Sequence, residues 1–399
     1  MAWHPHRRAA RRYRITLLFN ANKAYDRQVM EGVGEYLQAS QSRWDIFIED
    51  DFCLRSAPAT DWLGDGVIAD YDDADIEAQL AGVAVPVVGV GGSRLHSPYP
   101  PVHYIATDNA AQVELAWRHL QEKGISQFAF YGLPDSIHHR WAKEREMAFR
   151  RLASRNGYPL RVYQGSETSA VSWQHAQNRL ADWLQQLPPH CGIIAVTDSR
   201  ARHILQACES LNIPVPETLS VIGIDNEELT RYLSRVSLSS VVQGTRQMGF
   251  QAARLLQRLI DGEVLPMQRI LIPPQRVIGR RSTDYRSLND PAVIQAMHFI
   301  RGHASNGIRV EQVLDAVGLS RTSLDTRFKA ETGHSLHATI HAEKLTRARE
   351  MLTATALPVA EIAQVCGYPS LPYFYAVFRK AYGIPPGQYR EDNRHGIPE

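Results

Sequence analysis

Polar side chains, mostly carboxylates and amides, recur directly after short β-rich runs of this sequence. They are Asn20, Asn22, Asp26, Asp70, Asp72, Thr197, Asp198, Asp225 and Asn226. In an open parallel sheet, ligands bind beyond the carboxyl ends of the strands, so these side chains are expected to converge on one crevice. Their oxygens accept hydrogen bonds from hydroxyl groups, which suits a neutral polyol or sugar. Any one of them alone is more often a helix N-cap or a turn former, and it is their number that favours a binding site.

The last hundred residues contain two copies of a second pattern, near 310–329 and 359–380. In each copy an apolar helix ends at Gly, a short turn contains Ser, and a second helix carries Arg or Lys near its end. Gly suits the left-handed residue that ends a helix, and Ser suits the N-cap of the next one. This is the layout of a helix-turn-helix, which predicts DNA binding. One copy alone could be a helical hairpin of a small bundle, but two copies joined by a helix over 335–353 disfavour that interpretation.

The spacing of aromatic and apolar residues predicts which face of each second helix points outward. Leu324 and Phe328 are expected in the core of the first unit, as are Phe374 and Phe378 in the second. The residues expected to meet DNA are Arg321, Thr322, Asp325, Thr326 and Lys329, then Leu371, Pro372, Tyr375, Ala376, Arg379 and Lys380. The first face can hydrogen-bond to base edges, whereas the second offers mostly apolar contact, for example to thymine methyl groups. Lys329, Arg379 and Lys380 are placed for phosphates.

The helix between the two units sets their separation. Its 19 or so residues would span about 28 Å at 1.5 Å each. Such a strut could hold two recognition helices about one duplex turn, roughly 34 Å, apart on the same side of DNA. A monomer could then reach two successive major grooves.

The elements ahead of this tail alternate between strands and helices. Strands are expected at 14–19, 66–69, 85–90, 127–131, 192–196 and 220–224, and helices include 28–39, 109–123, 141–155 and 200–211. This alternation predicts parallel sheets with helices on both faces, and about 270 residues favour two such lobes. We therefore expect a basic, disordered extension at 1–12, a two-lobed α/β domain at 13–284, a linker at 285–290 and an all-α domain at 291–399.

Composition excludes several classes of protein. The 399 residues are 44% hydrophobic and 22% charged, as in an ordinary globular protein, and the longest apolar run is broken by Pro86 and Gly89, so no membrane segment is expected. The four cysteines lack paired spacing, which predicts a reducing cytoplasm and neither a zinc site nor disulfides. The Gly-rich run 89–92 does not continue into a dinucleotide motif, and His138 and His139 lack a third ligand. No cofactor and no metal are expected.

Several motifs of the α/β region resemble the sensor domains of LacI/GalR-type repressors and the related periplasmic sugar-binding proteins. They lie at 108–109, 115–132, 196–198, 213–225 and 242–249, so the likeness covers most of 13–282. The resemblance implies a site between two lobes that are joined by three crossing segments. It also implies that Arg145, Asp198 and Asp225 face the ligand, with Asn22 and Asp26 contributed by the first lobe. Such repressors carry a DNA-binding headpiece ahead of the sensor, where this sequence has only about a dozen residues, so DNA binding is expected from the tail.

The tail in turn resembles the AraC/XylS family over about a hundred residues. The similarity is clearest at 331–336, at Gly367 and Tyr368, at Phe374 and Phe378, and at 382–386. The base-contacting positions of that family correspond to the outward residues given above. Leu371, Pro372 and Ala376 are less polar than such positions often are, which puts base reading by the second unit in doubt.

The order of the two parts, together with 19–27 and 223–228, resembles the xylose-responsive regulators of enteric bacteria. That implies a cytoplasmic activator of xylose uptake and catabolism genes, with D-xylose as effector, operator DNA and RNA polymerase as partners, and a dimer as the active form. Two alternatives stay open: a regulator that responds to another pentose or hexose, and a transport or sugar-modifying protein that uses the same crevice. A transport protein would need a signal peptide, and the Arg-rich start lacks an apolar core. An enzyme would need a base or nucleophile with a tuned partner, which no spacing here indicates.

Overall fold

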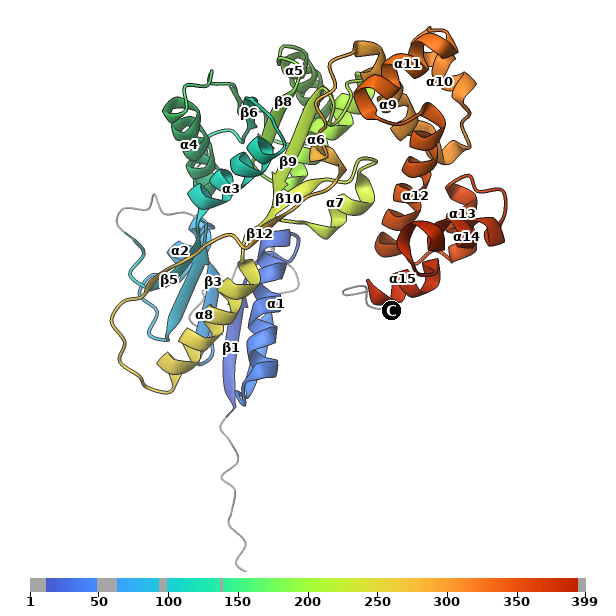
Figure 1. Ribbon diagram of the computed structural model, residues 1–399. Helices are drawn as coiled ribbons and strands as arrows, with labels where there is room; N and C mark the ends of the chain where they lie inside the picture. The colour runs from blue at the N-terminus through green and yellow to red at the C-terminus, as the bar shows by residue number, and fades with distance from the viewer. Residues whose placement is uncertain (1–11, 49–62, 93–98, 137–138, 394–399) are drawn as a thin grey trace, which may run out of the picture.

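The computed structural model describes residues 12–48, 63–92, 99–136 and 139–393. The expected N-terminal extension at 1–12 lies outside the described residues, except for Arg12. Two α/β lobes are followed by a helical domain, which confirms the predicted fold class (Figure 1). Within the described residues, no helix combines the length and apolar character that crossing a membrane requires.

Lobe 1 is built on a parallel sheet of six strands. In spatial order they are β11 (Arg269–Ile272), β5 (His103–Thr107), β4 (Val87–Gly91), β3 (Gly66–Asp70), β1 (Tyr13–Leu18) and β2 (Trp44–Ile48). Helices α1 (Ala24–Ala39) and α8 (Thr245–Ile260) cover one face, and α2 (Ala74–Gln79) covers the other. The backbones of α1 and α8 touch, because a Cβ on Gly32 or Gly249 would overlap a backbone oxygen of the opposite helix. Lobe 1 is thus assembled from two distant parts of the chain.

Lobe 2 has the same architecture with one antiparallel edge. Its strands, in spatial order, are β12 (Arg276–Ile278), β10 (Ser239–Val242), β9 (Leu219–Ile224), β8 (Cys191–Ala195), β6 (Gln127–Tyr131) and β7 (Val162–Tyr163). Its helices are α3 (Asn109–Glu122) and α4 (Arg140–Arg155) on one face, and α5 (Trp173–Gln185) and α6 (Asp198–Ser210) on the other, with α7 (Glu228–Leu233) after β9. Only β12 runs antiparallel to its neighbour.

Three segments cross between the lobes, at 107–109, 242–245 and 272–276. This agrees with the three crossings that the family resemblance implied. One helix begins earlier than expected: α1 starts at Ala24, ahead of the helix predicted at 28–39. The carboxylate of Asp26 accepts a hydrogen bond from the backbone N of Asn20 at 2.7 Å, which closes the turn ahead of the helix. The extra turn carries Asp26 on a helix rather than on a loop.

The helical domain contains two small cores that share one long helix. Its helices are α9 (Pro291–His303), α10 (Val310–Val317), α11 (Arg321–Thr332), α12 (Leu336–Ala354), α13 (Val359–Val365), α14 (Leu371–Tyr382) and α15 (Pro386–Asp392). The first core gathers α9, α10, α11 and the start of α12, and the second gathers the rest of α12 with α13 and α14. The expected 19-residue strut is therefore α12.

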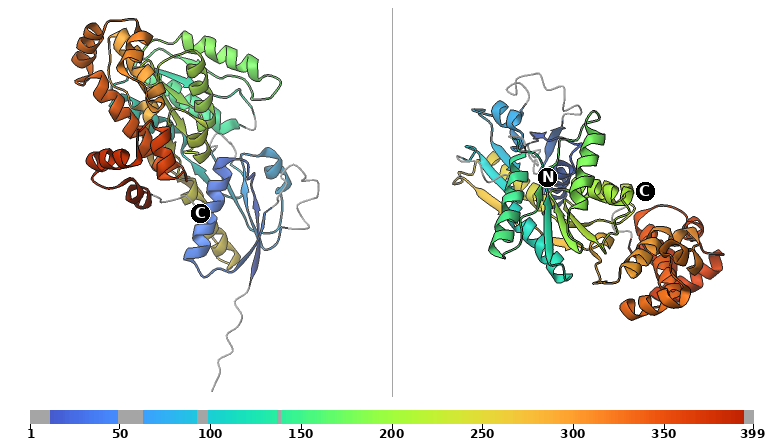
Figure 2. Two further views of the ribbon diagram at one scale, coloured as in Figure 1. Left: turned by 90° about the vertical axis from the view of Figure 1, so that its right-hand side faces the viewer. Right: turned by 90° about the horizontal axis from the view of Figure 1, so that it is seen from above.

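The helical domain stands beside lobe 2 in every view (Figures 1 and 2). A short 3-10 turn, η4 (Arg281–Thr283), ends the sensor region. In the segment expected to be a polar linker, Tyr285 packs into the lobe 2 core and Leu288 packs into the first core of the helical domain. The connection between the two packed side chains is therefore short, consisting of residues 286 and 287.

Candidate functional site

A cavity of about 550 Å³ opens between the two lobes, and we call it the inter-lobe cavity. It lies at the carboxyl ends of the strands, where the sequence predicted a crevice. Its lining comprises Asn20, Asn22, Lys23, Ala24, Tyr25, Asp26, Asp70, Asp72, Asp73 and Gly92 from lobe 1, His139, Trp141, Arg145, Thr197, Ser199, Asp225 and Glu227 from lobe 2, and Gln243 from a crossing segment. The residues expected to bind the sugar most directly were Asn22, Asp26, Arg145, Thr197, Asp198 and Asp225, and all of them except Asp198 line the cavity.

The lobe 1 wall of the inter-lobe cavity is a cluster of buried carboxylates. The Nζ of Lys23 lies 3.3 Å from a carboxylate oxygen of Asp70, and Asp72 accepts a hydrogen bond from the backbone N of Gly92 at 2.7 Å. Burial, reinforced by the charge of Asp70, raises the pKa of Asp72 to about 7. Burial also raises the pKa values of Asp26 and Asp70, and Lys23 counters part of that rise. Such buried carboxylates, partly short of hydrogen-bond partners, are well suited to accept hydrogen bonds from the hydroxyl groups of a ligand.

Arg145 is the centre of the lobe 2 wall, and its side chain is 3% exposed. Its Nε donates to Asn109 at 2.9 Å, its Nη1 donates to the carbonyl of Val196 at 2.5 Å, and its Nη2 donates to Gln243 at 3.0 Å. The carboxylate of Asp225 lies 4.0 Å from Nη1 and accepts a further hydrogen bond from Gln243. Arg145 thereby ties Asp225 to two of the segments that cross between the lobes.

Asp225 itself sits in a strained turn. Strand β9 ends at Ile224, and the next two residues, Asp225 and Asn226, have φ values of 125° and 49°. Residues other than glycine in this region cost on the order of 1–3 kcal/mol each, and such strain gathers at functional sites. Burial raises the pKa of Asp225 to about 8, although the neighbouring charge of Arg145 lowers it.

Asp198 does not line the inter-lobe cavity. Its side chain is 1% exposed, and its two oxygens accept hydrogen bonds from the hydroxyl of Ser240 at 2.6 Å and the backbone N of Glu227 at 2.8 Å. Asp198 thus holds the turn that carries Asp225. Thr197 does line the cavity, and its hydroxyl also caps α6 by accepting from the backbone N of Arg200 at 3.2 Å.

Several lining residues were absent from the predicted ligand set. They are Lys23, Tyr25, Asp70, Asp72, Trp141 and Gln243. Asp70 and Asp72 had been recognised as polar residues after a strand. Trp141 stands one helical turn before Arg145 on α4, and the Arg145 guanidinium lies 4.8 Å from the centre of its ring, so helical spacing from Arg145 could have identified it. Nothing in the local sequence marked Gln243 as part of a site.

The charges that line the inter-lobe cavity restrict the chemistry of its ligand. Two cations, Lys23 and Arg145, face six acidic residues: Asp26, Asp70, Asp72, Asp73, Asp225 and Glu227. A phosphorylated sugar or a sugar acid would bring more negative charge to a site whose acidic groups already raise one another's pKa, which is unfavourable in a partly buried place. A neutral polyol would instead donate its hydroxyls to the carboxylates, while Trp141 offers an apolar surface.

The first helix-turn-helix unit has the predicted geometry. Gly318 ends α10 with φ 73°, and the Ser320 hydroxyl caps α11 by accepting from the backbone N of Ser323. Leu324 and Phe328 are fully buried. The residues predicted to face DNA that are exposed here are Arg321, Thr322, Thr326 and Lys329. Asp325 is only half-buried and accepts from the backbone N of Leu336 at 3.5 Å, so its carboxylate faces the start of α12.

The second unit also has the predicted geometry. Gly367 follows α13 with φ 70°, and the Ser370 hydroxyl caps α14. Phe374 and Phe378 are fully buried. The exposed residues of α14 include every one predicted to face DNA: Leu371, Pro372, Tyr375, Ala376, Arg379 and Lys380. Tyr373 was not among the predicted residues, but its side chain is 48% exposed and enlarges the apolar outer face of α14.

Comparisons with known proteins match both parts of the chain. The family model described as XylR N-terminal domain matches 14–110, the periplasmic binding protein-like domain matches 117–283, and a helix-turn-helix domain matches 313–392. A solved structure described as the xylose-binding transcription activator xylR is 68% identical, with a TM-score of 0.89, and the match covers 96% of this chain and 99% of that one. A LacI-type regulator from Alkaliphilus metalliredigens, solved with D-xylulofuranose, is 18% identical with a TM-score of 0.53 and shares the sensor fold alone.

Two curated relatives match nearly the whole chain. The xylose operon regulatory protein of Escherichia coli K12 is 70% identical over 96% of this chain and 98% of its own length. Its counterpart in Haemophilus influenzae is 53% identical over 95% of this chain and 98% of its own length. The chain therefore belongs to the xylose operon regulatory protein family.

Proposed function

We propose that D-xylose binds in the inter-lobe cavity and controls how this protein binds operator DNA. The chain is a sugar-responsive, DNA-binding transcription regulator and not an enzyme, as the sequence predicted. One observation carries the assignment of the effector to this cavity. Carboxylates from both lobes, Asp72 and Asp225 among them, line the same cavity as the aromatic side chain of Trp141. A neutral pentose matches that arrangement, and relatives described as xylose regulators support D-xylose in particular.

The lobes already touch beside the cavity, which suggests how a sugar would act. Arg27 of α1 lies 3.5 Å from Glu227 of lobe 2, and the Gln28 side chain donates to the carbonyl of Asp225 at 3.1 Å. A sugar that bonds to Asp225 and to the lobe 1 carboxylates would strengthen the closed arrangement of the lobes. A coupling of about 1–3 kcal/mol, or roughly 5- to 150-fold in DNA affinity, is typical of such sensors.

The partners follow from this role. We propose that two copies act together, that the complex recruits RNA polymerase, and that the regulated genes serve xylose uptake and catabolism in the cytoplasm. The DNA surface consists of the exposed residues of α11 and α14, with direct hydrogen bonding to bases concentrated in α11.

A calorimetric panel tests the effector. D-xylose, L-arabinose, D-ribose and D-glucose would be titrated into the full chain, and operator binding would be measured with and without each saturating sugar. We expect D-xylose to bind best and to change operator affinity. Preference for another pentose or hexose would move the assignment to that sugar, and no response to any neutral sugar would overturn it.

Sugar affinity is expected to rise by up to about 50-fold between pH 6 and pH 8, because the ionised fraction of a carboxyl group with a pKa of about 8 rises from about 1% to about 50% over that range. Below its pKa of about 8, Asp225 is mostly protonated in the free site. An ionised carboxylate is a stronger hydrogen-bond acceptor for a sugar hydroxyl than a protonated one. Sugar binding should therefore release a proton from Asp225, and lowering the pH should weaken binding. Calorimetry in buffers of different ionisation enthalpy measures both quantities. The Asp225→Asn variant should bind more weakly and show a flatter pH profile; an unchanged profile in this variant would contradict the role of Asp225.

Replacing Lys329 by Ala is expected to weaken binding to all DNA sequences alike. Lys329 is exposed near the end of α11, where a charged side chain meets phosphate rather than base edges. Losing one phosphate contact should flatten the slope of log affinity against log salt by about one. Arg327→Gln is the matched control, because Arg327 lies on the same helix but bonds to Asp290 at 2.6 Å within the domain. A change in sequence preference in Lys329→Ala would contradict the phosphate role.

A further inference from the structure

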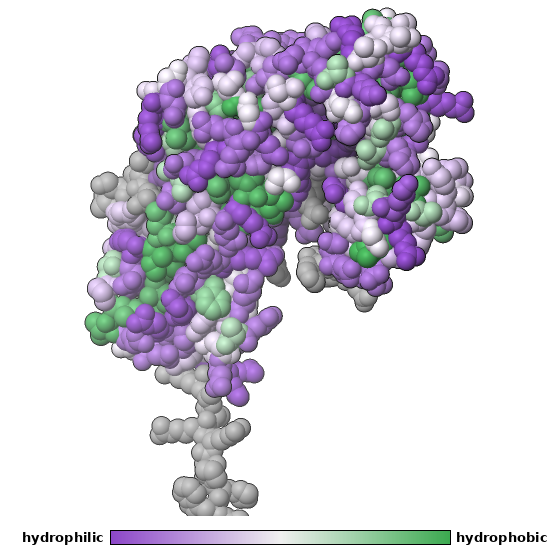
Figure 3. All heavy atoms as spheres, viewed as in Figure 1, coloured by the Kyte–Doolittle hydropathy of each residue, from purple (hydrophilic) through white to green (hydrophobic). Residues whose placement is uncertain are grey.

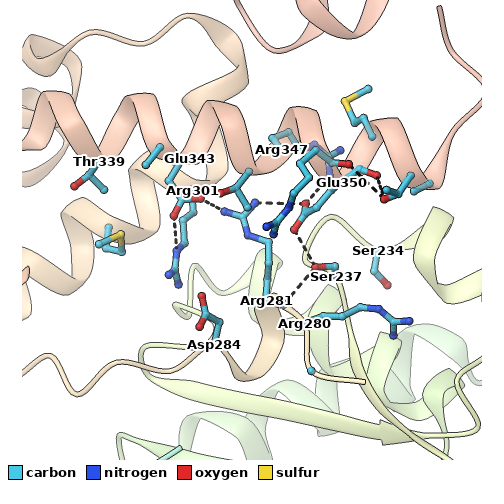
Figure 4. Close-up of a pocket in the computed structure, with 18 of the residues that line it drawn as sticks. Ser234, Ser237, Arg280, Arg281, Asp284, Arg301, Thr339, Glu343, Arg347 and Glu350 are labelled. Carbon is cyan, nitrogen blue, oxygen red and sulfur yellow. Dashed lines mark hydrogen bonds and ion pairs between the residues drawn. The ribbon is translucent and has the colours of Figure 1, made fainter. Parts of the chain in front are cut away.

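A chain of ion pairs joins lobe 2 to the helical domain (Figure 4). Arg301 on α9 pairs with Glu217 of lobe 2, and its Nε also lies 3.3 Å from Glu343 on α12. Arg281 of η4 reaches in the opposite direction, pairing with Glu343 and lying 3.8 Å from Glu350. Each domain thus contributes both an Arg and a Glu. We call these five residues the interdomain relay.

The interdomain relay is largely shielded from solvent. The side chains of Arg281 and Arg301 are 15% exposed, that of Glu343 is 14% exposed and that of Glu217 is 3% exposed. The buried apolar clusters of lobe 2 and of the helical domain share no member within the described residues. The surface around this junction is hydrophilic on the face seen in Figure 3. Ion pairs in a weakly solvated place, rather than a shared hydrophobic core, therefore fix the domains to each other.

One end of the interdomain relay is connected to the sugar-site turn. Glu217 lies just before β9, and Asp225 follows the last residue of the same strand. Arg280, next to Arg281, donates to the side chain of Asn226 at 2.9 Å. The turn η4 is itself held on β9, because the Ser282 hydroxyl donates to the carbonyl of Val221 at 2.5 Å. A shift of the Asp225 turn would thus be passed to Arg281 by direct bonds.

The other end of the interdomain relay lies on the helix that carries both DNA-binding units. Glu343 and Glu350 are two turns apart on α12, and the hydroxyl of Ser237 in lobe 2 donates to Glu350 at 3.4 Å. Because α12 contributes to the cores of both helix-turn-helix units, its position sets the placement of α11 and α14 together.

We propose that Glu217, Arg281, Arg301 and Glu343 are positioning residues that make α12 move with lobe 2, so that sugar binding reaches both recognition helices through this helix. The proposal rests on the proposed function and deepens it by naming the contacts that transmit the response. Such coupling requires a structural element whose position depends on both the sugar site and the DNA-binding surface. Helix α12 meets this requirement.

The test measures operator affinity of the full chain with and without saturating D-xylose. The ratio of the two affinities reports coupling, which a merely structural contact would leave unchanged. In Arg301→Gln and Glu217→Gln we expect this ratio to fall to within about twofold of one, whereas typical coupled proteins show roughly 5- to 150-fold. The double variant should lose no more than Arg301→Gln alone, because that change already breaks the pair with Glu217. D-xylose affinity without DNA should stay within about twofold of the unchanged protein.

The matched control is Glu209→Gln. Glu209 pairs with Arg235 at 2.9 Å, and both side chains are more than half exposed and form no part of the interdomain relay, so the coupling ratio should be kept. If Arg301→Gln and Glu217→Gln also keep the ratio of the unchanged protein, the proposal is overturned.

Small-angle scattering of the DNA-free chain provides a second readout that does not depend on the sugar. Both relay variants should show a larger maximum dimension, because only the contacts of Arg281 and Ser237 with α12 would remain of those described above. Arg281→Gln repeats this test from the lobe 2 side. If the unchanged protein shows no sugar dependence, the proposed function fails, and scattering still decides whether the relay fixes the domains. Scattering curves that match the unchanged protein would overturn the positioning role.

Discussion

Replacement of Arg145 by Met is expected to weaken D-xylose binding by about 100-fold or more. The guanidinium satisfies Asn109, the carbonyl of Val196 and Gln243, and it is the nearest described cation to Asp225. Without it, several buried polar groups lose their partners at about 1–3 kcal/mol each, and these costs are not fully additive. We therefore expect a loss of about 3 kcal/mol in sugar affinity and a lower thermal stability of the sensor.

Calorimetry with D-xylose and thermal unfolding measure these two effects. Arg150→Met is the matched control, because Arg150 lies on the same helix and pairs with Glu146 at 2.7 Å, but its side chain is 42% exposed. Arg150 does not line the inter-lobe cavity, and the buried Glu146 keeps a hydrogen bond from Gln164 at 2.9 Å, so this variant should bind sugar normally. If Arg145→Met bound D-xylose as tightly as the control does, Arg145 would have no place in the sugar site.

Replacement of Arg321 by Ala is expected to relax the choice of base at one operator position by about 1–3 kcal/mol. Arg321 is the first residue of α11, and side chains at the start of a recognition helix are the ones that reach base edges. In the free protein it lies 3.5 Å from Glu311, with both side chains more than 60% exposed, so this weak pair can give way to DNA.

Binding to a set of operators that differ by single base pairs measures this effect. The Arg321→Ala variant should lose discrimination at one position and keep it elsewhere, while Lys329→Ala should keep it at every position. An unchanged preference across the whole set would assign Arg321 to the DNA backbone instead.

The parts of the fold that could be predicted are those encoded by local patterns. The alternation of buried strands and amphipathic helices was sufficient for two parallel sheets, and β6 was predicted to the residue. The Gly and Ser of each helix-turn-helix were sufficient for the turn geometry of α10–α11 and α13–α14. Strands such as β10, β11 and β12 were not predicted, because each is only three or four residues long.

The candidate sugar site was predicted from the polar residues at strand ends and from the family resemblance, which implied Arg145. Asn22, Asp26, Thr197 and Asp225 were found because polar residues that follow buried strands stand out. Gln243 was missed because it belongs to a crossing segment, whose role depends on the arrangement of the two lobes. Asp198 was placed in the ligand set because its type and position fit, but Ser240 and Glu227 bind both of its oxygens, and these partners are distant along the chain. The interdomain relay escaped prediction for the same reason.

The divided origin of lobe 1 has a consequence for the order in which the chain folds. Helix α8, which packs against α1, and strand β11, which pairs with β5, are synthesised about 200 and 160 residues after their partners. Until they emerge from the ribosome, the apolar face that contains Val29 and Val33 has no cover from α8, and closing so large a loop is entropically slow. Lobe 2, apart from its edge strand β12, is continuous and can fold first. Lobe 1 is thus the part of the nascent protein that is most exposed to aggregation, and the inter-lobe cavity forms only after nearly all of the sensor has been translated.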